Sequence, residues 1–254
     1  MRPYYGEYAH VIHYPISDTS WAAPRATDEG YRSAFSTDVE GNPIYRSDMA
    51  AGDRYAAALQ AALGYFEAAG YRVENGVLTA PPEGAALSYE VLVGGGGTGD
   101  HPTFMALTMA SAALKDIGFQ LVVTDISNFS ELTGAVHSGT AELFAMAWGA
   151  DADPDMFQVY HSDGTSNATS YRIRDARLDE MILLARRSMD RDYRKSLYRS
   201  CLDIIADWAV EIPMYQRENA VVFSTERIDM ETVTGDMTPF WSWENDVEKM
   251  KLKQ

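Results

Sequence analysis

The chain has 254 residues, enough for one large or two modest domains, and 46% of them are hydrophobic, which is too many for a disordered protein. Its 21 Lys and Arg residues against 37 Asp and Glu residues give a formal charge of −16 at pH 7, which repels phosphate backbones and argues against nucleic acid as a partner. A single cysteine, Cys201, rules out an intrachain disulfide, and no segment approaches the ~20 apolar residues of a membrane span.

The first part of the chain combines an irregular segment with a predicted helix and hairpin. Residues 1–50 are rich in Tyr, Pro, Gly, Ser and Asp and show neither a helical nor a strand period. From Asp53, which can cap a helix, apolar residues recur at helical spacing up to Gly70, which can end it. The pair Asn75-Gly76 then predicts a β-hairpin.

Strands and helices alternate after the break at residues 81–84. Strands are predicted at residues 87–93, 119–124 and 142–148, with helices between them at residues 101–117 and 129–137. This order implies right-handed crossovers and a mainly parallel sheet.

The rest of the chain is predicted to be mostly helical. Two consecutive amphipathic helices follow at residues 177–189 and 192–208, and two short strands are expected around residues 217–219. Cys201 lies on the apolar face of the second helix, so we interpret it as a core residue. The cations of this region are interpreted as a solvated face of the two helices: Arg186, Arg187, Arg191, Arg194, Lys195 and Arg199.

A glycine-rich segment follows the strand predicted at residues 87–93. The sequence GGGGTG, from Gly94 to Gly99, fits the G-x-G-x-x-G pattern of a dinucleotide loop, and Asp125 ends the next strand, where NAD binding would place an acid. However, a run of four glycines fits almost any glycine pattern, and Asp100 brings negative charge close to the phosphate position. Dinucleotide binding therefore stays open as an alternative to a flexible turn.

Three alternating aspartates follow the strand predicted at residues 142–148. Asp151, Asp153 and Asp155 are spaced as at the start of a calcium loop, but Met156 and Ser162 occupy the positions where glycine and glutamate are needed. Carboxylates just beyond the C-terminal end of a parallel strand also suit a ligand crevice. A plain solvated loop fits the spacing equally well.

No set of residues typical of catalysis or metal binding is found. His10 and His13 form a His-x-x-His pair in an irregular segment, which is usually a surface feature and not a metal site, and there is no Gly-x-Ser-x-Gly elbow. No nucleophile, base and orienting group can be combined. We therefore predict a protein that is not an enzyme and has neither a cofactor nor a metal site.

The linear order of these elements resembles the C-terminal half of the peptide-type ABC-transporter solute-binding proteins, bacterial extracellular solute-binding protein family 5, which has dipeptide-, oligopeptide- and nickel-binding members. The resemblance covers essentially the whole chain, and seven pieces carry it in order: ALGYFEAAGYRVENGVL, LSYEVLV, ALKDIGFQLVV, SNFSELTGAVHSGTAELFAMAWGADADPDMF, Asn167 with Tyr171, DRDYRKSLYRSCLDIIADWA and EIPMYQRENAVVF. Each piece is weak alone, but their common order is specific. The resemblance implies an α/β fold, a type II periplasmic-binding-protein-like lobe with a mainly parallel mixed sheet flanked by helices.

The resemblance also implies a function. The chain would be part of the substrate-binding component of an ABC importer, which binds peptides in an interlobe cleft and delivers them to a membrane permease. The full-length protein would be a monomer located outside the cytoplasm, in the periplasm or as a cell-surface lipoprotein. Its signal peptide and N-terminal half would be absent from this chain.

The same resemblance suggests a division of the chain. Residues 1–50 would be an irregular crossing segment from a missing first lobe, residues 51–225 the C-terminal α/β lobe, and residues 226–254 a tail returning toward the missing lobe. Phe240, Trp241 and Trp243 in this tail would then lack their native packing partner.

The resemblance finally implies a set of ligand-binding residues. In peptide-binding members, an aspartate three residues after a tryptophan pairs with the peptide ammonium group, and the preceding strand pairs with the peptide backbone. The matching positions here are Asp151 and the segment of Ala147, Trp148, Gly149 and Ala150. Because the loop that follows Trp148 is one residue shorter than in the best-known receptors, Asp153 is an alternative to Asp151. Phe157, Asn167 and Tyr171 complete the set.

Two other functions remain as alternatives. One is a cytoplasmic NAD-dependent oxidoreductase that uses the turn from Gly94 to Gly99. The other is an intracellular sensor domain with the same fold, although no DNA-binding or kinase segment supports it.

Overall fold

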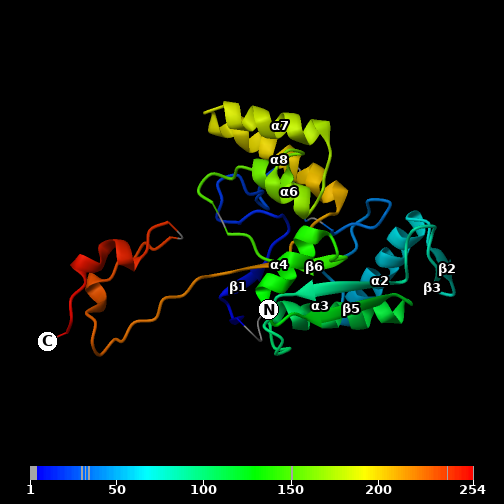
Figure 1. Cartoon of the computed structure of the whole chain (residues 1–254), viewed down its shortest axis with the longest axis horizontal. Helices are drawn as coiled ribbons and strands as arrows, with labels where there is room; N and C mark the ends of the chain where they lie inside the picture. The colour runs from blue at the N-terminus through cyan, green and yellow to red at the C-terminus, as the bar shows by residue number, and fades with distance from the viewer. Residues whose placement is uncertain are drawn as a thin grey trace.

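A three-stranded parallel sheet lies at the centre of the α/β part of the protein (Figure 1). The computed structural model describes residues 5–29, 31, 33, 35–149, 151–238 and 240–253. Strand β4 (Ser88–Val93) lies between β5 (Gln120–Asp125) and β6 (Leu143–Ala145) and runs parallel to both. Helix α3 (Pro102–Asp116) connects β4 to β5, and α4 (Phe129–Ser138) connects β5 to β6. The predicted alternation and parallel sheet are confirmed, but the third strand ends at Ala145, earlier than expected.

Helix α2 (Ala51–Ala68) and a hairpin complete the first core. The hairpin consists of β2 (Arg72–Glu74) and β3 (Val77–Ala80), and Asn75 and Gly76 between them have φ angles of 54° and 78°. Two positive φ angles are typical of the type I′ turn that Asn-Gly favours, so the predicted hairpin is confirmed. The core itself is formed by apolar residues of α2, the hairpin, the sheet and the end of α3: Leu63, Leu78, Val91, Ile117, Phe119 and Leu121.

The predicted cap of α2 is wrong. The helix begins at Ala51 with Ala50 as its N-cap, and no side chain caps it. Asp53 lies in the first turn instead. There its negative charge still favours the helix, because the free N–H groups of the first turn carry positive partial charge.

A second core is built from helices. Helices α5 (Phe157–Tyr160) and α6 (Thr165–Thr169) precede the predicted pair, α7 (Ala176–Arg187) and α8 (Arg191–Trp208). Asp175 and Asp190 cap the pair, each accepting two backbone N–H bonds at the helix start. Most of the fully buried residues of this core come from α7 and α8: Leu178, Ile182, Ala185, Tyr198, Cys201, Leu202 and Ile205. Cys201 is thus confirmed as a core residue.

Part of the irregular segment at residues 1–50, called the lead-in below, packs into this second core. Tyr14 and Ala22 are buried in the core, and Trp21 and Tyr31 pack against it. Strand β1 (Ala9–Val11), in the lead-in, pairs antiparallel with β7 (Tyr215–Arg217), which lies far along the chain. No strand was predicted in residues 1–50, because a three-residue strand with a partner so distant in sequence leaves no local period.

The C-terminal part leaves the body as an extended segment (Figure 1). Only β7 forms around residues 217–219, and its partner is β1, so the prediction of two strands there is wrong. The segment leads to two short 3₁₀ helices, η1 (Met230–Thr232) and η2 (Trp243–Lys249), and Ile228 bridges to Leu252.

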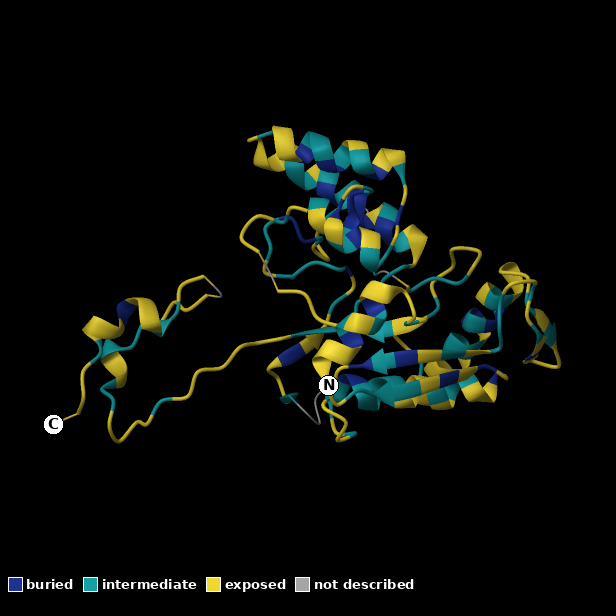
Figure 2. Cartoon of the chain, viewed as in Figure 1, coloured by how far each residue is buried: buried dark blue, intermediate teal, exposed yellow. Residues whose placement is uncertain are grey.

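The part of the chain after β7, called the C-terminal unit below, is mostly exposed (Figure 2). Val222 is 92% exposed, and about half the surface of Phe240 and of Trp241 is exposed as well. Trp243 packs edge to face on Phe223 at 5.7 Å between ring centroids. Among the described residues, no helix has both the length and the apolar character needed to cross a bilayer.

Candidate functional site

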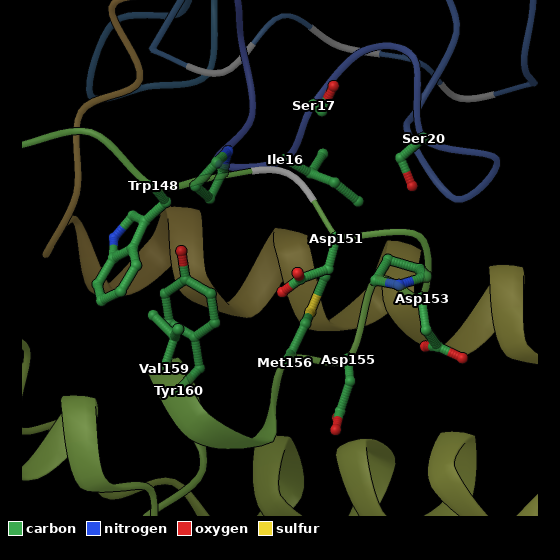
Figure 3. A pocket seen from close by; sticks show the side chains of 12 residues that line it. Ile16, Ser17, Ser20, Trp148, Asp151, Asp153, Asp155, Met156, Val159 and Tyr160 are labelled. Atoms are coloured by element: carbon green, nitrogen blue, oxygen red, sulfur yellow. The ribbon is translucent and has the colours of Figure 1, made fainter. Parts of the chain in front are cut away.

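A pocket of about 120 Å³ lies between the lead-in and the acidic loop that follows β6 (Figure 3). The first wall comes from the segment that follows β1, and its residues are Pro15, Ile16, Ser17 and Ser20. The second wall comes from the loop before α5 and from α5 itself: Trp148, Asp151, Asp153, Pro154, Asp155, Met156, Val159 and Tyr160. The lining therefore combines apolar side chains with three carboxylates.

The structure brings three of the predicted site residues together. Trp148, Asp151 and Asp153 all line the pocket, whereas Ala147 and Gly149 flank it without lining it. Ala150 lies outside the described residues. Residues 147–149 do not form the strand predicted for them. Among the described residues, Trp148 and Gly149 have no backbone-to-backbone hydrogen-bond partner.

Two of the three aspartates are held by arginines. Arg194 of α8 donates to both carboxylate oxygens of Asp153, at 2.6 and 2.9 Å, and to the hydroxyl of Tyr198 at 2.9 Å. The hydrogen bond to Asp153 raises the pKa of Arg194 and keeps the guanidinium charged. Asp155 lies 3.3 Å from Nε of Arg186 on α7 and accepts the backbone N–H of Phe157.

The interpretation of the arginines as a purely solvated face is therefore wrong for Arg194. Only 15% of its side chain is exposed, against 45% for Arg186. Helical spacing puts Arg194 beside the core face, but the aspartate that accepts its hydrogen bonds lies in a loop before the helices, so the sequence gives no sign of the pair.

Asp151 is the carboxylate that remains without a cation in the described part of the chain. It is exposed, and its side chain points toward Trp148 and Tyr160, while Asp153 and Asp155 point elsewhere (Figure 3). Because the three carboxylates diverge, they do not form the calcium site considered from their spacing. Among the described residues, no group of His, Cys, Asp and Glu is arranged to hold a metal ion. The pocket can instead hold one cationic group beside Asp151.

A hydrogen-bonded aromatic network lies behind the pocket. Nε1 of Trp148 donates to the hydroxyl of Tyr171 at 2.9 Å, and the ring of Tyr171 stacks on Tyr160 at 5.5 Å. The hydroxyl of Tyr160 donates to Oε2 of Glu211 at 2.8 Å. The sequence prediction included Tyr171 but missed Glu211, which lies beyond α8 and far along the chain from the acidic loop.

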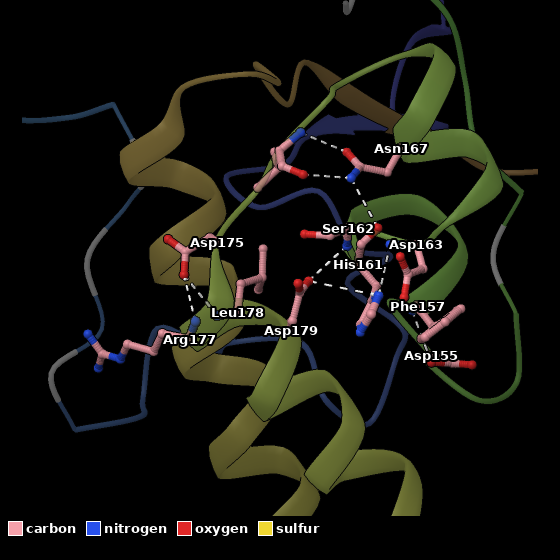
Figure 4. Close-up of polar contacts among 11 residues, drawn as sticks. Asp155, Phe157, His161, Ser162, Asp163, Asn167, Asp175, Arg177, Leu178 and Asp179 are labelled. Carbon is pink, nitrogen blue, oxygen red and sulfur yellow. Dashed lines mark hydrogen bonds and ion pairs between the residues drawn. The ribbon is translucent and has the colours of Figure 1, made fainter.

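Asn167 holds the protein's own backbone (Figure 4). Its side chain is buried, and both amide hydrogens are used in bonds to the carbonyls of His161 and Ile173, at 3.0 and 2.8 Å. Its oxygen accepts the N–H of Ile173 at 2.9 Å. The structure therefore places Asn167 behind the site, where it fixes the turn between α6 and α7.

Phe157 also lies outside the pocket lining. Its ring stacks on His161 at 4.3 Å, and the guanidinium of Arg186 lies 4.4 Å from its centroid on the ring face. This stack joins α5 to α7. Phe157 thus supports the acidic loop and does not face the ligand space of this chain.

The glycine-rich loop after β4 binds a carboxylate of the protein itself. Asp125 accepts the N–H of Gly99 at 2.9 Å. Desolvation would raise the pKa of Asp125, but the N–H groups of Gly99, Gly97 and Gly95 outweigh it and hold the pKa below its usual value. The N–H groups of Gly99 and Gly96 are thus bonded to the protein itself, to Asp125 and to the carbonyl of Ile126, and the Asp125 carboxylate places negative charge at the loop. Both features argue against a pyrophosphate at this loop.

Comparison with known proteins gives matches among solved structures. No protein-family model matches the sequence, and no curated protein sequence matches it. The oligopeptide-binding protein AppA from Bacillus subtilis, solved with a nonapeptide, matches with a TM-score of 0.58 at 17% identity, over 97% of this chain and 43% of that chain.

Two further structures give similar values. NikZ from Campylobacter jejuni, in complex with Ni(L-His), matches with a TM-score of 0.57 at 19% identity, over 83% of this chain and 37% of that one. The Escherichia coli murein tripeptide binding protein MppA matches with a TM-score of 0.56 at 16% identity, over 82% and 34% of the two chains.

These similarities establish the fold. The predicted α/β class, a type II periplasmic-binding-protein-like lobe with a parallel sheet flanked by helices, is confirmed. The chain spans between a third and a little over two fifths of the length of the three proteins named above, at 34%, 37% and 43%.

Proposed function

We propose that this chain is the C-terminal lobe of the solute-binding component of an ABC importer, and that it binds small peptides or related amines for delivery to a membrane permease. The observation that carries the proposal is the carboxylate of Asp151, which has no cationic partner among the described residues, in a pocket whose other two aspartates are held by Arg194 and Arg186. The fold shared with solute-binding proteins of ABC importers supports it. Binding and release, without chemistry, would be its whole activity.

Asp151 is the proposed partner of the ligand ammonium group. A carboxylate that already accepts two bonds from an arginine gains little from a second cation, so Asp153 is a poor candidate. Asp151 has no such partner among the described residues and points toward Trp148 and Tyr160 (Figure 3). The backbone groups of Trp148 and Gly149, which have no backbone partner in the part of the chain that the structure describes, would pair with an extended ligand next to Asp151, independently of the ligand's side chains.

The whole binding protein would contain more than this pocket. We propose that residues 51–225 form the C-terminal lobe, that residues 1–50 cross from a first lobe, and that residues 226–254 return to it. The exposed aromatic residues Phe240 and Trp241 in the C-terminal unit support this assignment, because exposed aromatic surface is typical of an interface. We further propose that the full-length protein works as a monomer outside the cytoplasm.

A titration of the isotope-labelled chain tests this function. Tri-alanine should shift the backbone amide signals of the acidic loop, and N-acetyl-tri-alanine, which lacks the ammonium group, should not. Asp151→Asn should abolish the response, whereas Glu180→Gln, a matched loss of one negative charge on the exposed face of α7, should leave it unchanged. Equal binding of the free and acetylated peptides would overturn the assignment of Asp151, and no binding of either peptide by the chain or by its full-length source protein would overturn the function.

A further inference from the structure

The lining of the pocket has an apolar part that belongs to the second core. Met156 and Tyr160 line the pocket and are each only 4% exposed. Ile16 of the lead-in and Val159 of α5 line it as well, and both pack against the same core. Because the core holds these four side chains, the apolar surface that they offer is present before any ligand binds.

The volume of the pocket limits what this apolar surface can cover. At about 120 Å³ the pocket is a little smaller than the roughly 150 Å³ of a cavity that holds benzene. A branched aliphatic group, of the size of a leucine or valine side chain, therefore fits. Covering such a group is favourable because it removes apolar surface from water.

The charged part of the lining leaves one negative charge unbalanced. Asp153 and Asp155 are each paired with an arginine, at 2.6 Å from Arg194 and 3.3 Å from Arg186. Asp151 has no cationic partner among the described residues, and its carboxylate points toward Trp148 and Tyr160 (Figure 3). One ammonium group beside Asp151 would balance this charge.

A carboxylate of the ligand would find no cation in the lining. Among the described residues that form the two walls, none is a Lys, an Arg or a His. The guanidinium of Arg25, in the lead-in, donates to the backbone carbonyls of Asp18 and Ser20. In a free amino acid the carboxylate is one carbon away from the ammonium group, so it would be brought close to Asp151, and like charges at such a distance repel each other.

We propose that the pocket selects primary amines that carry a small branched apolar side chain and, in place of a free carboxylate, an uncharged group. Amino-acid amides and peptides with an apolar first residue meet this description, and free amino acids do not. The ammonium group would lie beside Asp151, and the side chain would lie between Ile16 and Val159. This inference rests on the function proposed above and narrows its class of ligand.

Methyl NMR of the chain tests where such an amine binds. With the Ile, Met and Val methyl groups labelled, L-leucinamide should shift the signals of Ile16, Met156 and Val159 at about pH 6, where an α-amino group is charged. The signals of Val222, which is 92% exposed in the C-terminal unit, should stay in place.

Three further compounds test what the pocket selects. L-leucine, which adds a carboxylate, and N-acetyl-L-leucinamide, which lacks the ammonium group, should each bind at least about tenfold more weakly than L-leucinamide. Glycinamide keeps the ammonium and the amide but has no side chain to cover. It should bind roughly tenfold more weakly as well.

A substitution in the apolar part separates the side-chain site from the ammonium site. Val159→Thr puts a hydroxyl group in place of a methyl group, so L-leucinamide should bind roughly fivefold more weakly while glycinamide binds as before. Val222→Thr, the same change at an exposed position, should alter neither affinity. If Val159→Thr fails to fold, Ile16→Thr on the lead-in wall gives the same comparison.

The outcomes distinguish this inference from the function on which it rests. If tri-alanine binds, equal affinities for L-leucinamide and L-leucine, or for L-leucinamide and glycinamide, would overturn the selectivity alone. An equal loss of L-leucinamide affinity in Val159→Thr and Val222→Thr would overturn it too. If neither tri-alanine nor L-leucinamide binds to the chain or to its full-length source protein, the function and the selectivity fail together.

Discussion

Arg194 holds both carboxylate oxygens of Asp153 with a single guanidinium nitrogen, at 2.6 and 2.9 Å, and so ties the acidic loop to helix α8. The guanidinium is enclosed further by aromatic rings, since its carbon lies 5.3 Å from the ring centroid of Trp21 and 5.5 Å from that of Tyr198. One arginine thus joins the loop, the lead-in and the helical core.

Replacing this arginine should loosen all three elements. Arg194→Leu leaves the Tyr198 hydroxyl and Asp153 without their donor, and we expect a loss of about 1–2 kcal/mol in the free energy of unfolding. Urea denaturation measures it. Arg187→Leu is the matched control, since Arg187 is exposed at the end of α7 and has no ion pair or hydrogen bond among the described residues. Equal losses in the two variants would contradict this account.

Asn167→Ala should be costly, because the side chain is buried in the turn that it holds. It removes three hydrogen bonds inside a buried turn and leaves the backbone N–H and C=O of Ile173 without these partners, while the carbonyl of His161 keeps its bond from the N–H of Gly164. We expect roughly 3 kcal/mol of destabilisation. The neighbouring Ser166→Ala, which loses one exposed bond to Gln158, should cost only a few tenths of a kcal/mol. Thermal unfolding of both variants gives the comparison, and a small effect for Asn167→Ala would mean that the turn is held by other contacts.

The glycine-rich loop should not tolerate an added methyl group at Gly95. A Cβ on Gly95 would lie 2.5 Å from Oδ1 of Asp125 and 2.8 Å from Cβ of His101, so Gly95→Ala should destabilise the chain by about 2 kcal/mol. Gly134→Ala, inside α4 with nothing within 4 Å, should instead raise stability slightly. Calorimetry of the two variants tests this prediction. The melting temperature of the unsubstituted chain should not respond to NAD, and a clear rise with NAD would reopen dinucleotide binding.

The C-terminal unit should melt locally in acid. The hydrogen bond from Lys249, followed by those from Thr234 and Trp241, lowers the pKa of Asp246 from 3.8 to about 2. Since the folded-state pKa is the lower one, the stabilisation is present above the unfolded value and is lost as the pH falls toward 2. The indole signal of Trp241 should report this loss, and Asp246→Asn should remove its pH dependence. An unchanged acid profile in Asp246→Asn would assign the transition to another group.

Much of the fold could be predicted because its signals are local. Asn75 and Gly76 specify their turn by backbone conformation alone, and the alternation of strands with helices specifies the parallel sheet. The pairing of β1 with β7 could not be predicted, because neither short strand has a period and each depends on the other.

The candidate site was predictable only in part for the same reason. Trp148 and Asp151 were found through a resemblance in sequence order, and both line the pocket. The contacts that distinguish Asp151 from Asp153 come from α8, and Glu211, which accepts the hydroxyl of Tyr160, comes from the segment after it. Such contacts depend on how distant segments pack, which no spacing rule contains.

The β1–β7 pair has a consequence for engineering. Because Val11 lies opposite Tyr215, the chain enters and leaves the body at adjacent points, and the body from Ile12 to Met214 has neighbouring ends. Units with neighbouring ends tolerate circular permutation and insertion into a host protein. A short linker from Met214 to Ile12, with new termini opened at the exposed Asn75-Gly76 turn, should give a permuted body that keeps both cores and the pocket.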